Sequence, residues 1–151
     1  MFYKKEKGLE IGSFLYILFF RKGEKMAQGI ITKTGREKLC KAHAGDSNLP
    51  PITQMGFGNG GVEADGTVIP TTGDEITLRN ELLRKDIHSH SYPETTSCRY
   101  STRLDKLDLA NQNISEMGLF DSNGDLVAYK TCLPKGKDDD MEFVFDMDEI
   151  F

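Results

Sequence analysis

The chain has 151 residues, of which 38% are hydrophobic, and its formal net charge is −5. This length fits one domain with a single hydrophobic core. The negative charge, with no lysine and arginine cluster beyond residue 25, argues against nucleic-acid binding, which draws affinity from clustered cations. Cys40, Cys98 and Cys132 are too few and too widely spaced for a disulfide framework, and none forms a CxxC zinc motif. We therefore expect reduced thiols.

The first 25 residues differ in composition from the rest of the chain. A basic start precedes an apolar run at 11–20, which is too short for a membrane-spanning helix of about 20 residues. No small-residue cleavage site follows this run. The sequence RKGEK before Met26 is what a purine-rich ribosome-binding site would encode if it were read as protein, so we predict that translation begins at Met26. We predict a mis-annotated or disordered extension at 1–25 and a domain at 26–151, with membrane association through 9–20 as an alternative.

The first predicted helix spans 36–44. Thr34 and Glu37 have the spacing of a capping box, in which the threonine hydroxyl accepts the N–H of the glutamate. Gly45 follows the helix and tolerates the left-handed conformation of a helix C-terminus.

A strand at 52–57 and a second short helix are predicted next. Pro50 and Pro51 extend the chain before the strand, and a loop follows at 62–72. The second helix starts at Gly73 or Asp74 and continues to about residue 83. Its apolar residues fall on roughly one side of a helix. They are Ile76, Leu78, Leu82 and Leu83.

The second half of the chain reads as antiparallel strands. Residues 98–104 alternate between apolar and polar, as do residues 141–147. Between them, 114–120 and 126–132 flank DSNGD, in which Asn123 and Gly124 can both adopt the positive φ of a tight hairpin turn. The predicted fold class is therefore α+β, with two short helices packed on a mainly antiparallel β-sheet or sandwich.

The glycine-rich stretch 55–61, MGFGNGG, matches the pattern G-x-G-x-x-G. In a dinucleotide-binding motif a helix begins at the third glycine, and its N-terminal N–H groups bind the pyrophosphate. Gly66 and Pro70 follow here and exclude a helix, and no Lys-Ser or Lys-Thr completes a P-loop. The glycines are interpreted as a close-packed turn at the end of a strand.

Other chemical motifs are incomplete. In DSNGD, Asp121, Asn123 and Asp125 stand at alternate positions, as the ligands of a calcium loop do. Leu126 and Cys132, however, stand where such a loop needs glycine and glutamate. His88 and His90 would face the same way on a strand, and a small metal-assisted binding module built on them is an alternative function. Neither G-x-S-x-G nor HExxH occurs, so we predict no enzyme activity, no catalytic residues and no cofactor.

The chain from Met26 to about Met147 resembles the N-terminal domain of the phage tail-collar fibre family. The first helix matches that family's pattern at Ile31, Thr32, Gly35, Leu39 and Ala42. The turn Gly58-Asn59-Gly60 matches next, followed by a small helix with Thr77, Leu78, Asn80 and Glu81. The most specific block is Glu116-Met117-Gly118-Leu119-Phe120, followed by Gly124-Asp125-Leu126-Val127-Ala128.

The resemblance implies a structural protein of the virion tail in a phage, prophage or phage-tail-like particle. Such a domain fixes a tail fibre to the baseplate by protein–protein contacts, and fibres of this kind work as trimers. The expected partners are other tail or baseplate proteins, with no nucleic acid and no membrane. The sequence up to residue 151 contains no segment expected of a fibre shaft. A separate fibre polypeptide, a truncated gene and a stand-alone adaptor are the open explanations.

The matched block also permits physical expectations. A carboxylate at Glu116 on a half-buried strand needs a backbone or arginine partner, unless the residue lies at the surface. Ser115 stands where the family usually has arginine, which argues against an ion pair at that point. Gly118 is expected at a bulge or a close backbone approach, and Leu119 and Phe120 in the core. An edge strand rich in Phe and Asp near residue 145 could add a partner strand.

Overall fold

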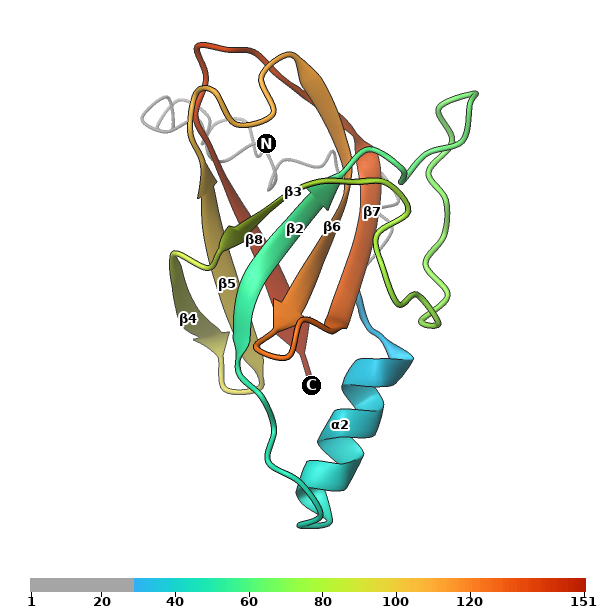
Figure 1. Cartoon of the computed structure of the whole chain (residues 1–151), viewed down its shortest axis with the longest axis vertical. Coiled ribbons are helices and arrows are strands. Elements are labelled where there is room, and N and C mark those ends of the chain that lie inside the picture. The colour runs from blue at the N-terminus through green and yellow to red at the C-terminus, as the bar shows by residue number, and fades with distance from the viewer. Residues whose placement is uncertain (1–28) are drawn as a thin grey trace.

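The computed structural model describes residues 29–151, which form two antiparallel sheets and one helix (Figure 1). The five-stranded sheet has the order β1-β7-β6-β2-β3, and the three-stranded sheet has the order β4-β5-β8. The elements are β1 (Ile30–Ile31), α2 (Lys33–His43), β2 (Ile52–Gly58), β3 (Glu81–Asp86), β4 (Ser89–Glu94), β5 (Ser97–Leu104), β6 (Gln112–Asp121), β7 (Leu126–Lys137) and β8 (Phe143–Ile150). The predicted extension at 1–25, the start at Met26 and the apolar segment 9–20 lie outside the described residues.

The main core lies between the two sheets. Alternate residues of the strands supply it, so that Phe57 of β2 contacts Phe145 of β8 with ring centroids 5.1 Å apart. The buried members of this core are Met55, Phe57, Leu104, Ile114, Met117, Leu119, Val127, Ala128, Phe143, Phe145 and Met147. Burial of these side chains is the main stabilising term of the sandwich.

The predicted α+β class with two helices is wrong, because the described residues are largely β-sheet with a single helix. The second helix was expected from residue 73 or 74 to about 83. Residues 73–80 instead form an irregular segment, and Leu82 and Leu83 belong to β3. The N–H groups of Arg79 and Asn80 donate to the side chain of Glu116 instead of to carbonyls one helical turn earlier. Ile76, assigned to the apolar side of that helix, is 73% exposed. Hydrogen bonds to Glu116, which is distant in the sequence, therefore stabilise an irregular backbone where the local apolar spacing predicted a helix.

The predicted first helix is present, but it begins earlier than expected. Thr32, not Thr34, is the N-cap, and its hydroxyl accepts the N–H of Gly35 at 3.1 Å. At the other end Gly45 has a φ of +84°. The N–H of Gly45 donates to Ala42, and the N–H of Asp46 donates to Lys41, which is the Schellman pattern.

The predicted strands of the second half are present, including the alternation along β5 and β8. The hairpin turn differs from the prediction, because only Gly124 has a positive φ, at +84°. The N–H of Gly124 donates to the carbonyl of Asp121, and the pairing of β6 with β7 shifts register before Phe120. This is a three-residue loop with a bulge. Cys40 is exposed, while Cys98 and Cys132 are buried, and all three are free cysteines.

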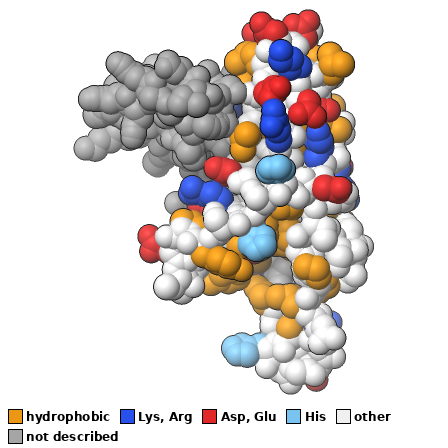
Figure 2. All heavy atoms as spheres, turned by 90° about the vertical axis from the view of Figure 1, so that its left-hand side faces the viewer, with side chains coloured by type: hydrophobic (Ala, Val, Ile, Leu, Met, Phe, Trp, Pro, Cys, Tyr) orange, Lys and Arg blue, Asp and Glu red, His pale blue; other side chains and the backbone are white. Residues whose placement is uncertain are grey.

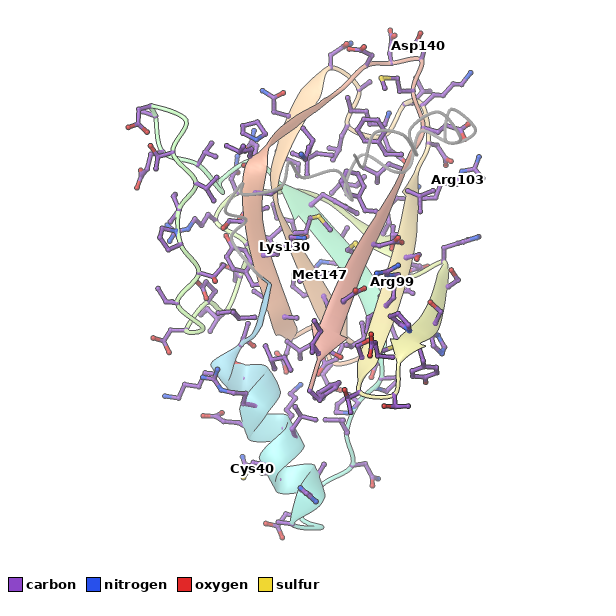
Figure 3. The ribbon with its side chains drawn as sticks, turned by 180° about the vertical axis from the view of Figure 1, so that it is seen from behind. Cys40, Arg99, Arg103, Lys130, Asp140 and Met147 are labelled. Atoms are coloured by element: carbon purple, nitrogen blue, oxygen red, sulfur yellow. The ribbon has the colours of Figure 1, made fainter. Side chains whose placement is uncertain are left out.

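Helix α2 lies at one end of the sandwich, close to the end of β8 (Figure 1). Lys38 holds the helix there by ion pairs with Asp121 and Asp125 at the β6–β7 turn, 2.5 and 2.6 Å long. Asp140 lies at the opposite end of the molecule from Cys40 of α2 (Figure 3). The end that carries α2 is therefore built from the helix, the β6–β7 turn and the last residues of β8.

Candidate functional site

Glu116, from the most specific block of the sequence, is fully buried on the outer face of the five-stranded sheet. One carboxylate oxygen, Oε1, accepts the N–H groups of Gly60 at 3.0 Å and Asn80 at 2.8 Å. The other, Oε2, accepts the N–H of Arg79 at 2.8 Å and the hydroxyl of Tyr129 at 2.6 Å. Burial and the neighbouring carboxylate raise the pKa of Tyr129, so the hydroxyl keeps its proton and donates. Of the two expectations for Glu116, backbone partners rather than surface exposure are found.

The glycine turn packs directly against this carboxylate. A Cβ on Gly58 would lie 2.3 Å from the carbonyl oxygen of Asn80 and 2.5 Å from Glu116 Oε1, and one on Gly60 would lie 2.9 Å from the same Oε1. Gly61 donates its N–H to the hydroxyl of Ser115 at 2.9 Å. These glycines are required by the close approach of neighbouring atoms, because side chains would displace the loop from Glu116.

Gly118 provides space for a second small core on the outer face of the sheet. It pairs with Gly56 across β6 and β2, so neither strand carries a side chain at that point. A Cβ on Gly118 would lie 2.4 Å from Leu126 Cδ1 and 2.9 Å from Leu78 Cδ1. The buried cluster there consists of Leu78, Phe120, Leu126 and Tyr129. Gly118 thus marks a close approach, and Leu119 points to the main core while Phe120 points to this outer cluster.

The remaining motif glycines serve the helix and the turn. A Cβ on Gly35 would lie 2.5 Å from the carbonyl oxygen of Val127, so glycine lets α2 touch β7. Thr32 strengthens this contact, because its hydroxyl donates to the carbonyl of Leu126 at 2.8 Å. Gly124 has open space around it, and its positive φ alone explains the residue.

The motif residues therefore build the interior of a scaffold. The structure brings together Gly58, Gly60, Glu116 and Gly118 from the predicted set, and it places Gly35 and Gly124 at separate points. Tyr129 was not predicted as a partner of Glu116, since no pattern in a single sequence pairs the two residues. Because four donors within the chain already occupy the carboxylate of Glu116, this residue does not offer a binding surface to a partner.

One hollow lies at the end of the sandwich that carries α2, and we call it the α2 hollow. Its volume is about 300 Å³, and its walls include Leu39, Leu49, Pro51, Tyr92, Val127 and Phe151. Glu149, at the end of β8, also lines it and is buried. Sequence reasoning missed Glu149 because the predicted strand ended at 147. The alternation of Phe143, Phe145 and Met147 continues to this residue and was the available signal.

The histidine pair proposed as a metal site is exposed. The ring of His90 lies 5.8 Å from that of Tyr92 and 6.3 Å from that of Tyr100. Within residues 29–151 no group of three or more His, Cys, Asp or Glu side chains is placed to hold a metal ion. Over the same residues, no helix has the length and apolar character needed to cross a bilayer.

Comparison with known proteins identifies a family. The family model described as phage tail-collar fibre protein, N-terminal, matches residues 25–142. This range contains α2, the glycine turn, Glu116 and the β6–β7 hairpin, and it covers most of the chain. No curated protein and no solved structure gives a significant match.

Proposed function

Because the chain belongs to the phage tail-collar fibre protein family, we propose that it attaches a tail fibre to the tail or baseplate of a phage or a phage-tail-like particle. Proteins of this family have a structural role in the phage tail and associate with other tail proteins. Beyond this family role, we propose that the chain attaches the fibre and that it does so at the tail or baseplate.

The observation that supports this proposal most is the family match over residues 25–142. The packing around Glu116 supports it too, because the motif residues hold loop 59–80 against the sheet and leave no reactive side chain exposed among them. A rigid scaffold of this kind suits a part that must hold a fixed orientation under load.

The partners proposed are other tail or baseplate proteins and a separate fibre polypeptide, with the chain acting as a homotrimer. β8 forms an edge of the three-stranded sheet, so one side of its backbone has no neighbouring strand within that sheet. Figure 3 shows Met147 on this strand and Arg99 on the adjacent β5. An edge strand offers N–H and C=O groups to a strand from a partner.

Purified particles provide the direct test. The gene, with an epitope tag, is expressed in the producing host, and tails are isolated by density gradient and probed by immunoblot and electron microscopy. We expect the chain in the tail fraction, and we expect tails without fibres when the gene is deleted. Fibre-bearing tails from the deletion strain would contradict the attachment role.

The trimer is tested separately by sedimentation equilibrium of the purified chain. The expected mass is three times the chain mass of 16.9 kDa. A monomer at all concentrations, together with a single copy per attachment point in particles, would contradict the trimer without removing the attachment role. Avidity would then not contribute to fibre attachment.

A further inference from the structure

The α2 hollow has large apolar side chains at its rim, and these side chains are exposed to solvent. Leu49, Tyr92 and Phe151 line it and are 49%, 71% and 62% exposed. These large apolar side chains come from three separate parts of the chain and meet at one place. Figure 2 shows apolar side chains gathered at the lower end of the sandwich near α2, while charged side chains dominate its upper half. Grouped apolar exposure of this kind marks interaction sites on protein surfaces.

A carboxylate lines this apolar hollow. Glu149 is 8% exposed, and the hydrogen bond found for its side chain is a long one of 3.4 Å from the hydroxyl of Tyr100. A carboxylate has about four acceptor positions, and a buried charge needs several partners to offset its desolvation. Burial raises the pKa of Glu149, with the Tyr100 hydrogen bond acting in the opposite direction, which indicates that the ionised form is poorly compensated.

The groups that line the α2 hollow do not supply a cation for Glu149. Lys38 also lines the hollow, but its ammonium group is paired with Asp121 and Asp125. The other titratable side chains that line it with Glu149 are Tyr92, Cys98 and Tyr100, and none of them carries a positive charge in any protonation state. The hollow with its immediate neighbours is therefore negative overall, and it favours a positively charged occupant.

We propose that the α2 hollow is a docking socket for an arginine side chain, flanked by apolar residues, on a partner tail protein. This inference rests on the proposed attachment function and names the surface and the chemistry of its partner. The aliphatic stem of arginine would pack against the apolar walls while its guanidinium meets Glu149. A volume of about 300 Å³ suits one or two side chains. Arginine anchors in apolar pockets are common energetic centres of protein interfaces.

A small-molecule probe tests the socket without knowledge of the partner. The full chain, labelled with ¹⁵N, is titrated with n-butylguanidinium and, as a neutral analogue of the same shape, with n-butylurea. We expect chemical-shift changes of amides around the hollow, such as those of Leu39, Tyr92 and Glu149, with butylguanidinium. Binding should be about tenfold weaker for butylurea, because the neutral group lacks the charge-assisted bond.

The Glu149→Gln variant supplies the second arm. Its amide still accepts the Tyr100 hydrogen bond, and it should lose the preference for the cationic probe. The matched control is Glu142→Gln, which removes an exposed carboxylate paired with Arg103 outside the hollow and should keep the preference. Equal binding of the two probes, shift changes away from the hollow, or no changes with butylguanidinium would overturn the proposal.

Particle assembly separates the socket from the proposed function. Glu149→Gln should reduce incorporation of the chain into isolated tails about tenfold, while Glu142→Gln should leave it unchanged. Normal incorporation of both variants would overturn the socket and keep the attachment role. If the wild-type chain is absent from tails, the attachment role fails, and the probe titration still decides whether the hollow prefers a guanidinium.

Discussion

The hydroxyl of Tyr129 donates a hydrogen bond of 2.6 Å to the carboxylate of Glu116, and both residues are fully buried. Tyr129 lies on β7 opposite Gly118 of β6, where the missing side chain leaves room on the outer face of the sheet. The same carboxylate accepts three backbone N–H groups from loop 59–80. One glutamate therefore joins two strands to a long loop, and that loop covers the small outer core.

Replacing Glu116 with glutamine should destabilise the protein strongly. Glutamine has one acceptor oxygen for the four donors that surround Glu116. Its NH₂ group is itself a donor, so it cannot accept the hydrogen bonds of the donors that it would face. We expect a loss of about 3 kcal/mol in the free energy of unfolding, measured by urea denaturation. Glu63→Gln, an exposed change in the same loop, should stay within about 0.5 kcal/mol of wild type. Equal midpoints for the two variants would refute this role of Glu116.

Gly58→Ala should also be destabilising, for a steric reason. The new Cβ would lie 2.3 Å from the carbonyl oxygen of Asn80, a backbone atom that cannot rotate away. We expect a cost of about 2 kcal/mol or more and a lower thermal midpoint by calorimetry. Gly29→Ala is the matched control, since a Cβ there would meet no atom closer than 3.5 Å. A control as unstable as the Gly58 variant would contradict the contact explanation, because the smaller chain entropy of unfolded Gly→Ala variants acts in the stabilising direction.

The parts of the fold that could be predicted are those with a local signal. The alternation along 98–104 and the DSNGD turn depend on neighbours in the sequence, and both elements are present. The backbone donors to Glu116 lie 36 to 56 positions away, so no local pattern indicates them. The apolar spacing after Gly73 suggested a helix. The long-range hydrogen bonds to Glu116 explain why that helix does not form.

The α2 hollow could not be predicted from the sequence for a similar reason. Leu49, Tyr92 and Phe151 meet only because the segment after α2, strand β4 and the residue after β8 come together at one end of the sandwich. A single sequence carries no signal of that meeting. Glu149 was within reach, because it continues a period of two that is plain in β8.

The position of the helix cap gives a test that compares sequence reasoning with the structure. Thr32→Ala should cost about 1–2 kcal/mol, because the hydroxyl both accepts the N–H of Gly35 and donates to the carbonyl of Leu126. Thr34→Ala should be neutral or slightly stabilising, since alanine is the better helix former inside α2. Thermal unfolding of the two variants decides, and a larger loss for Thr34→Ala would favour the capping box predicted from sequence.

Glu149 should make the stability of the protein depend on pH in a direction unusual for a carboxylate. Burial raises its pKa in the folded state above the ordinary value of 4.5, with the Tyr100 hydrogen bond opposing the shift. Between these two pKa values the folded state binds the proton more tightly than the unfolded chain does. The free energy of unfolding contributed by this group therefore falls as pH rises through that window.

Glutamine at position 149 does not titrate, so Glu149→Gln should be more stable than wild type at pH 7.5 and should lose that advantage near pH 4, where the glutamate is protonated in both states. Thermal midpoints of the two proteins at both pH values measure the difference. Tyr100→Phe removes the hydrogen bond that opposes the shift, and it should therefore extend the pH window upward. If Glu149→Gln is instead less stable than wild type only at pH 7.5, the carboxylate already has a stabilising cation within the folded chain. The charge argument for an arginine in the α2 hollow would then fail.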